Sequence, residues 1–95
     1  MKKILCVCGT GQGSSFVLRM AIEEMLNMKG LSAEVEHSDA SIACGEKCDY
    51  IVTTKEIGES ITNPRAKFFY ITNFINKKIL GEELKELFDE IEQAQ

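Results

Sequence analysis

The fold of this chain is decided by residues 4–15, which read Ile4-Leu5-Cys6-Val7-Cys8-Gly9-Thr10-Gly11-Gln12-Gly13-Ser14-Ser15. An apolar run gives way to a loop with glycine at every second position, and the closing serine pair can begin a helix. The pattern predicts a strand, an anion-binding loop and a helix, because glycines let successive backbone N–H groups point at one place. The unpaired N–H groups and the dipole of that helix favour an anion or a thiolate there.

Three interpretations of this loop compete. In the first, Cys8 is only a small buried residue in a strand-to-helix turn, since glycine-rich loops alone are weak indicators. The second is a nucleotide-binding loop, but Ser14 and Phe16 do not supply the glycine that a dinucleotide fingerprint needs, and no Gly-Lys-Ser/Thr follows. The third is a nucleophilic thiolate that carries a phosphoryl group, because a helix N-terminus stabilises the anionic form of a cysteine. The residues favour the third interpretation.

The same loop supports a resemblance to a known family. Cys8-Gly9-Thr10-Gly11-Gln12-Gly13-Ser14-Ser15, followed by a helix rich in methionine and leucine, resembles the phosphocysteine loop of the enzyme IIB components of the bacterial sugar phosphotransferase system. The pattern Cys-Gly-x-Gly-Gln-Gly-Ser-Ser is most similar to the ascorbate-type IIB proteins, and the galactitol, lactose and cellobiose loops are more distant. The motif is confined to about the first twenty residues, whereas length and strand order are similar over the whole chain.

The resemblance implies a chemistry and two partners. Cys8 is the expected catalytic residue: its thiolate takes a phosphoryl group from a phosphohistidine of a IIA protein and passes it to a sugar bound in a IIC membrane permease. Loop N–H groups and hydroxyls would hold the phosphoryl oxygens, and the Gln12 amide could donate to them or face a docking partner. We expect no metal and no other cofactor. The expected phosphate-binding residues are Gly9, Thr10, Gly11, Gln12, Gly13, Ser14 and Ser15.

Composition restricts the class of protein. The 95 residues fit one small domain, 1–95, and the charged fraction of 27% is that of a globular chain. A net charge of -4 argues against a nucleic-acid partner. The apolar run from Ile4 to Cys8 is too short for a signal peptide or a membrane span. We therefore expect a cytoplasmic protein, transiently at the inner face of the membrane, whose four cysteines are thiols.

The rest of the chain alternates between strand and helix patterns. An α/β fold follows, with a four-stranded parallel sheet in the order 2-1-3-4 and helices on both faces, which the family resemblance describes as flavodoxin-like with a phosphatase-like loop. Ligands of such sheets bind beyond the carboxyl ends of the strands, where Cys8, Thr53-Thr54 and Asn73 fall. Strands are expected at 2–7, 32–37, 49–53 and 67–72, and helices at 15–29, 55–61 and from Gly81 onward.

Periodicity predicts which residues of the helices are buried. Gly30 is the expected residue just after the first helix, and the methionines of that helix are read as core rather than as metal ligands. The second strand, with its alternating glutamates, is expected at the edge of the sheet. The predicted buried positions are Val17, Leu18, Ala21, Ile22, Met25 and Met28 in the first helix, and Leu84, Leu87, Phe88 and Ile91 in the last.

Other chemically active residues have plainer explanations. Cys44 and Cys48 could bind a metal or form a redox pair, but no second matched pair exists and they are read as incidental loop thiols. His37, at the end of an edge strand, is given no catalytic role. The acidic residues between 81 and 92 are read as the solvated face of the last helix, which could contact a partner.

Two other functions stay open. Low-molecular-weight tyrosine phosphatases and arsenate reductases use a Cys-x5-Arg loop in a similar fold, and Cys44 and Cys48 could resolve a disulfide as in a reductase. Here Ser14 stands at the arginine position, Arg19 and Arg65 lie elsewhere, and Asn63 precedes Pro64 where the phosphatase acid is expected. A non-catalytic binding module is the third possibility, and it is favoured if Cys8 proves unreactive. The sequence does not define the sugar, the particular partners or the oligomeric state.

Overall fold

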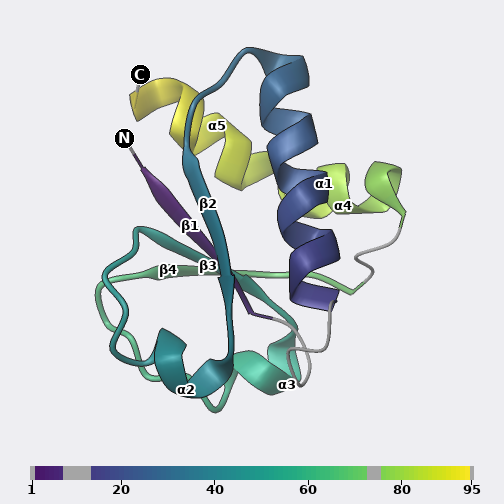
Figure 1. Ribbon diagram of the computed structural model, residues 1–95. Helices are drawn as coiled ribbons and strands as arrows, with labels where there is room; N and C mark the ends of the chain where they lie inside the picture. The colour runs from purple at the N-terminus through teal and green to yellow at the C-terminus, as the bar shows by residue number, and fades with distance from the viewer. Residues whose placement is uncertain (1, 8–13, 73–75, 95) are drawn as a thin grey trace.

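The computed structural model describes residues 2–7, 14–72 and 76–94. Strands and helices alternate along these ranges, and the two ends of the chain lie near one another (Figure 1). The strands are β1 (Lys3–Val7), β2 (Glu34–Ser38), β3 (Tyr50–Thr53) and β4 (Lys67–Tyr70). The helices are α1 (Ser14–Lys29), α2 (Ala40–Ala43), α3 (Lys55–Gly58), α4 (Lys77–Glu83) and α5 (Lys85–Ala94).

The four strands form one parallel sheet in the order β2-β1-β3-β4, which confirms the predicted topology. β1 is central: Cys6 lies opposite His37 of β2 and opposite Val52 of β3. β2 is an edge strand, as its alternating glutamates predicted. Because all strands run the same way, their carboxyl ends meet along one edge of the sheet.

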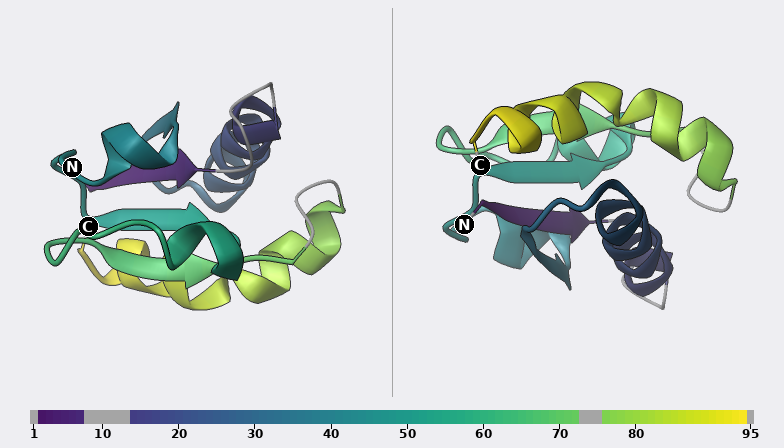
Figure 2. Two further views of the ribbon diagram at one scale, coloured as in Figure 1. Left: turned by 90° about the horizontal axis from the view of Figure 1, so that it is seen from below. Right: turned by 90° about the horizontal axis from the view of Figure 1, so that it is seen from above.

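Helices cover both faces of the sheet and create two apolar cores. Residues of α1, α4 and α5 pack on one face against Ile4, Cys6 and Val52. On the other face, α2 and α3 cover Leu5, Val7 and Ile51. This alternation along β1 and β3 is the period of two that a strand buried on both faces requires. Figure 2 shows β1, β3 and β4 side by side, with α4 and α5 following one another on the β4 side of the sheet.

The first helix ends where the sequence predicted. Gly30 has a φ of 69°, a conformation that favours glycine, and the Leu31 N–H donates to the Leu26 carbonyl at 2.9 Å. The predicted buried stripe of α1 is right at Leu18, Ala21, Ile22 and Met25. It is wrong at Val17 and Met28, which are 48% and 79% exposed, because these two side chains face a groove beside α4 rather than the core.

The carboxyl-terminal part also differs from the prediction. The final helix was expected from Gly81, but α4 already begins at Lys77, since the Asn76 side chain accepts hydrogen bonds from the Lys78 and Ile79 N–H groups. β4 ends at Tyr70 rather than Thr72, because the Thr72 N–H donates to the Glu83 carboxylate at 3.0 Å instead of to the sheet. The predicted buried residues Leu84, Leu87, Phe88 and Ile91 are all buried.

Candidate functional site

At the carboxyl edge of the sheet, the central strand β1 is followed by a short connection and then by α1, the longest of the described helices. β1 ends at Val7, which is fully buried and pairs with Ser38 of β2, and the 16 residues of α1 begin at Ser14. The connection between them spans residues 8–13. A helix of this length presents unpaired N–H groups and the positive end of its dipole at its first turn. The predicted residues Cys8, Gly9, Thr10, Gly11, Gln12 and Gly13 lie outside the described residues, and Ser14 and Ser15 are described in their backbone alone.

A buried hydroxyl lies at the end of the neighbouring strand. Thr53 is fully buried, and within the described ranges its Oγ1 atom has no hydrogen-bond partner. A buried hydroxyl without a partner costs about 1–3 kcal/mol, and the described residues supply no such partner for Thr53. Thr54, the next residue, instead caps α3 by accepting from the Ile57 N–H at 3.5 Å. Asn73, predicted at the same edge, lies outside the described residues.

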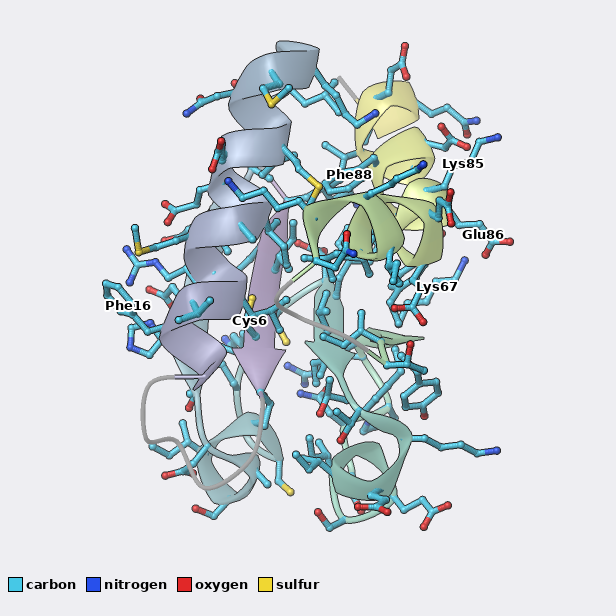
Figure 3. All side chains as sticks on the ribbon, turned by 90° about the vertical axis from the view of Figure 1, so that its right-hand side faces the viewer. Cys6, Phe16, Lys67, Lys85, Glu86 and Phe88 are labelled. Carbon is cyan, nitrogen blue, oxygen red and sulfur yellow. The ribbon has the colours of Figure 1, made fainter. Side chains whose placement is uncertain are left out.

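The first turns of α1 contact β2 through a small cluster that the sequence analysis missed. The His37 ring meets the Phe16 ring edge-on, with centroids 5.5 Å apart. Arg19 donates from Nη1 to His37 Nδ1 at 3.3 Å and from Nε to Glu23 at 3.3 Å. Figure 3 shows Phe16 on the outer side of α1, away from the core where Cys6 lies. No sequence pattern relates Phe16 to His37, because the contact depends on how α1 packs along β2.

In this cluster the Arg19 guanidinium already has two partners. The guanidinium is held between Glu23, on its own helix, and His37, on the edge strand. Since the arginine donates to Nδ1, that nitrogen acts as the acceptor. Arg19 is therefore engaged at the outer side of α1, and Arg65 is exposed after the turn at Pro64.

Cys44 and Cys48 lie in the connection from α2 to β3. The Cys44 side chain is exposed, with its thiol directed at the Ser60 carbonyl at 3.9 Å. Cys48 is buried, and this burial raises the pKa of its thiol. A thiol that is harder to ionise is a poorer nucleophile, so Cys48 is suited to packing rather than to chemistry. Among the described residues, no group of three or more His, Cys, Asp or Glu side chains is placed to hold a metal ion.

Asn63 has a structural role beside the connection from α2 to β3. Its side chain is buried, and Nδ2 donates to the Ala43 and Glu46 carbonyls, both at 2.9 Å. The Glu46 carboxylate in turn pairs at 2.8 Å with Lys3, the first residue of β1. Asn63 therefore ties two connections together towards the amino end of the sheet, away from the carboxyl edge where β1 meets α1. Asn63 stands where a phosphatase would have its acid, and its hydrogen bonds explain the residue without catalysis.

No helix within the described ranges is both long and apolar enough to cross a lipid bilayer.

Several known proteins are similar to this chain. A sequence model of the family described as "PTS system, Lactose/Cellobiose specific IIB subunit" matches residues 3–88. The "Ascorbate-specific PTS system EIIB component" of Escherichia coli O157:H7 is 30% identical over 95 residues, which cover 93% of this chain and 90% of that protein. The protein of the same name from Shigella sonnei is 30% identical over 92 residues, covering 90% and 87%.

A solved structure shares the fold. The lactose-specific IIB component domain from Streptococcus pneumoniae superposes with a TM-score of 0.61, covering 93% of this chain and 95% of that one. The two sequences are 18% identical, so the likeness concerns the arrangement of the backbone.

Proposed function

Because the chain belongs to the IIB family of the sugar phosphotransferase system, we propose that its Cys8 carries a phosphoryl group between two partner proteins. As a IIB component the chain takes part in phosphotransfer coupled to sugar transport. The finer proposal names the carrier atom, the donor and the acceptor: Cys8 Sγ, a IIA phosphohistidine and a sugar held by a IIC permease. It also treats residues 1–95 as one carrier domain.

The observation that carries this proposal is the position of the cysteine-bearing segment. Residues 8–13 connect the buried end of the central strand, at Val7, to the N-terminus of α1 at Ser14. A helix N-terminus favours a thiolate over a thiol and afterwards favours the charge of a bound phosphoryl group. Both stages of a carrier cycle therefore benefit from the same backbone groups.

The proposed transfer is a pair of displacements at phosphorus. The Cys8 thiolate attacks the phosphorus of the donor, the S–P bond forms, and the P–N bond breaks with its electron pair left on the histidine nitrogen. A sugar hydroxyl then attacks the same phosphorus, the S–P bond breaks, and the thiolate is regenerated as the hydroxyl proton leaves to the solvent or to a base of the permease. We propose that the N–H groups of Gly9, Gly11 and Gly13 and the side chains of Thr10, Gln12, Ser14 and Ser15 hold the phosphoryl oxygens in both steps.

The substrate is proposed from the relatives. Two proteins that are 30% identical to this chain carry the name of an ascorbate-specific system. We propose an ascorbate-type acceptor, and we propose that the chain acts in the cytoplasm and binds at the inner face of the membrane when it meets the permease.

Two residues that could be compared with the accessory groups of a phosphatase, Arg19 and Asn63, are engaged in other contacts. Arg19 is paired with Glu23 and His37, and the Asn63 amide is committed to backbone carbonyls. A phosphatase needs a guanidinium on the phosphoryl oxygens and an acid for the leaving group. These commitments support a carrier, which must protect its phosphocysteine from water.

Intact-mass measurement tests the proposal. The full chain is incubated with phosphoenolpyruvate, the general phosphotransferase proteins and candidate IIA proteins. We expect a gain of one phosphoryl group that peptide mapping assigns to residue 8. Absence of the gain with every donor, or its assignment to His37, would contradict the proposal.

A further inference from the structure

A groove runs between α1 and α4, on the side of the molecule that faces the viewer in Figure 3. It consists of two neighbouring hollows. The first, of about 590 Å³, is lined by Val17, Met20 and Ala21 of α1 together with Lys77 of α4. The second, of about 620 Å³, lies between Met25 and Met28 of α1 and the Lys78 and Gly81 region of α4. An ion pair between Glu24 and Lys77 separates the two hollows.

The floor of this groove is apolar and open to solvent. Met28 is 79% exposed and Met20 is 55% exposed, although both belong to the main helix of the domain. Gly81 keeps the second hollow open, because a side chain at that position would extend into the space beside the Met25 sulfur, 3.7 Å from the first added carbon. Apolar side chains left exposed together beside a concavity are typical of a binding surface.

The rim of the second hollow carries more positive than negative charge. Lys29, Lys77, Lys78 and Lys85 line it, against the two carboxylates of Glu24 and Glu82. In the ranges that the structure describes, Lys78 and Lys85 form no ion pair. The whole chain has a net charge of -4, so this local excess of lysine is a feature of the groove. A partner that presents carboxylates beside apolar side chains complements it.

We propose that this groove binds an acidic amphipathic helix of a protein with which the chain exchanges its phosphoryl group; this inference rests on the proposed function. The geometry gives the spacing of the anchors. Met20 and Met28 are eight residues apart along α1, which corresponds to about 12 Å. A partner helix lying along α1 would therefore place two apolar side chains about two turns apart, one in each hollow, with carboxylates facing the lysines. The groove starts at Val17, one turn from the beginning of α1, so a helix bound there holds its protein beside the phosphoryl site.

Two other occupants fit the surface less well. A second copy of the chain offers an acidic helix in α5, but none of its large apolar side chains is exposed. An anionic lipid surface would be attracted by the lysines. A lipid surface is flat, however, and does not fill a concave groove. Its phosphates would also lie against the carboxylates of Glu24 and Glu82.

Titration of the full chain with designed peptides tests the inference. The probe is a synthetic peptide of about four helical turns with two leucines about two turns apart and glutamates beside them. A matched peptide has lysine in place of each glutamate. We expect the acidic peptide to shift NMR amide signals of α1 and α4, and the lysine peptide to bind at least about tenfold more weakly.

Substitutions in the chain provide the second part of the test. Lys78→Glu combined with Lys85→Glu should weaken binding of the acidic peptide about tenfold, and Gly81→Leu, which fills the second hollow, should weaken it similarly. Lys55→Glu on α3, at the other face of the sheet, is the matched control and should leave binding unchanged. Equal binding of both peptides, or binding that ignores the groove substitutions, would overturn the inference. Preferential binding of the chain to phosphatidylglycerol vesicles would also overturn it. So would a dimer, observed by sedimentation, that dissociates when the two lysines are substituted.

Failure of the proposed function is recognised separately. If the wild-type chain gains no phosphoryl mass from any donor, the carrier proposal fails whatever the peptides do. If it gains the mass, the paired lysine substitutions should raise the KM for the partner that uses the groove and leave kcat unchanged. An unchanged KM for both donor and permease would overturn the groove inference alone.

Discussion

Two connections of this domain carry cysteines, and they differ in what surrounds the thiol. The connection from β1 to α1 contains Cys8 and leads into the N-terminus of a 16-residue helix. The connection from α2 to β3 contains Cys44 and Cys48, and the buried Asn63 amide donates hydrogen bonds to its backbone. Cys48 is buried there, and its pKa is raised by that burial.

We propose that position, and not residue type, decides the role of each thiol. A cysteine before a helix N-terminus is stabilised as an anion and can act as a nucleophile. A cysteine withdrawn from water is stabilised as the neutral thiol and behaves as a small apolar side chain.

The largest effect is expected for the proposed carrier atom. Cys8→Ser should abolish phosphoryl acceptance, because a serine hydroxyl stays protonated in a site that activates its nucleophile by stabilising an anion. Cys44→Ser and Cys48→Ser, singly or together, should retain it. The measurement is phosphoryl mass gained from a charged IIA protein. Loss of activity in the double variant, with activity retained in Cys8→Ser, would favour a redox enzyme instead.

Alkylation rates should separate the thiols without any partner protein. At neutral pH, iodoacetamide should modify Cys8 at least about tenfold faster than Cys48, because only the thiolate reacts and burial disfavours it at Cys48. Cys44, which is exposed, should react at an intermediate rate. Mass spectrometry of peptides over time gives the three rates. A Cys8 that reacts as slowly as Cys48 would support a non-catalytic binding module.

Asn63 should matter for stability and not for transfer. Asn63→Ala removes one donor from each of two carbonyls, those of Ala43 and Glu46, and we expect the free energy of unfolding to fall by about 1–3 kcal/mol. The exposed Asn27→Ala is the control and should change it by less than about 0.5 kcal/mol. Urea unfolding gives both values. Phosphoryl acceptance that vanishes in folded Asn63→Ala would mean that the residue acts at the site.

The smallest effect is a pH dependence of stability. The ordinary pKa of a thiol, 9.0 here, is raised at Cys48 in the folded chain, so the unfolded chain loses this proton first as the pH rises. The folded state then binds more protons, and stability should decline above pH 9.0. Cys48→Ala should make this decline less steep between pH 9.0 and 10.0. Above pH 10.0, Tyr50 begins to contribute as well, because burial also raises its pKa. Identical slopes for both proteins would contradict the burial argument.

Most of the fold could be predicted from the sequence, because strand and helix periodicities indicate which face of each element is apolar. The order of the sheet, the edge position of β2 and the end of α1 at Gly30 were predicted and are confirmed. The start of α4 was missed since it depends on the Asn76 cap before two lysines, with no apolar signal. Val17 and Met28 were misplaced because periodicity cannot distinguish a core from an open groove.

The site could be predicted only as far as its motif reaches. The residues from Cys8 to Ser15 were identified from glycine spacing and family resemblance, and their individual roles stay predictions. Contacts that depend on packing left no signal in the sequence: His37 was given no catalytic role, and its contacts with Phe16 and Arg19 across the interface between α1 and β2 were not predicted. The unpartnered hydroxyl of Thr53, among the described residues, was likewise invisible in the sequence.

The central claim is that Cys8 holds a phosphoryl group for transfer rather than for hydrolysis, and the lifetime of that group tests it most directly. The phosphorylated chain is separated from its donor, and loss of the phosphoryl mass is followed in neutral buffer with and without membranes that contain the matching permease and its sugar. We predict persistence for minutes or longer in buffer and rapid discharge, with formation of sugar phosphate, when the membranes are added. Rapid loss in buffer alone, with inorganic phosphate as the product, would contradict the carrier function and support a phosphatase.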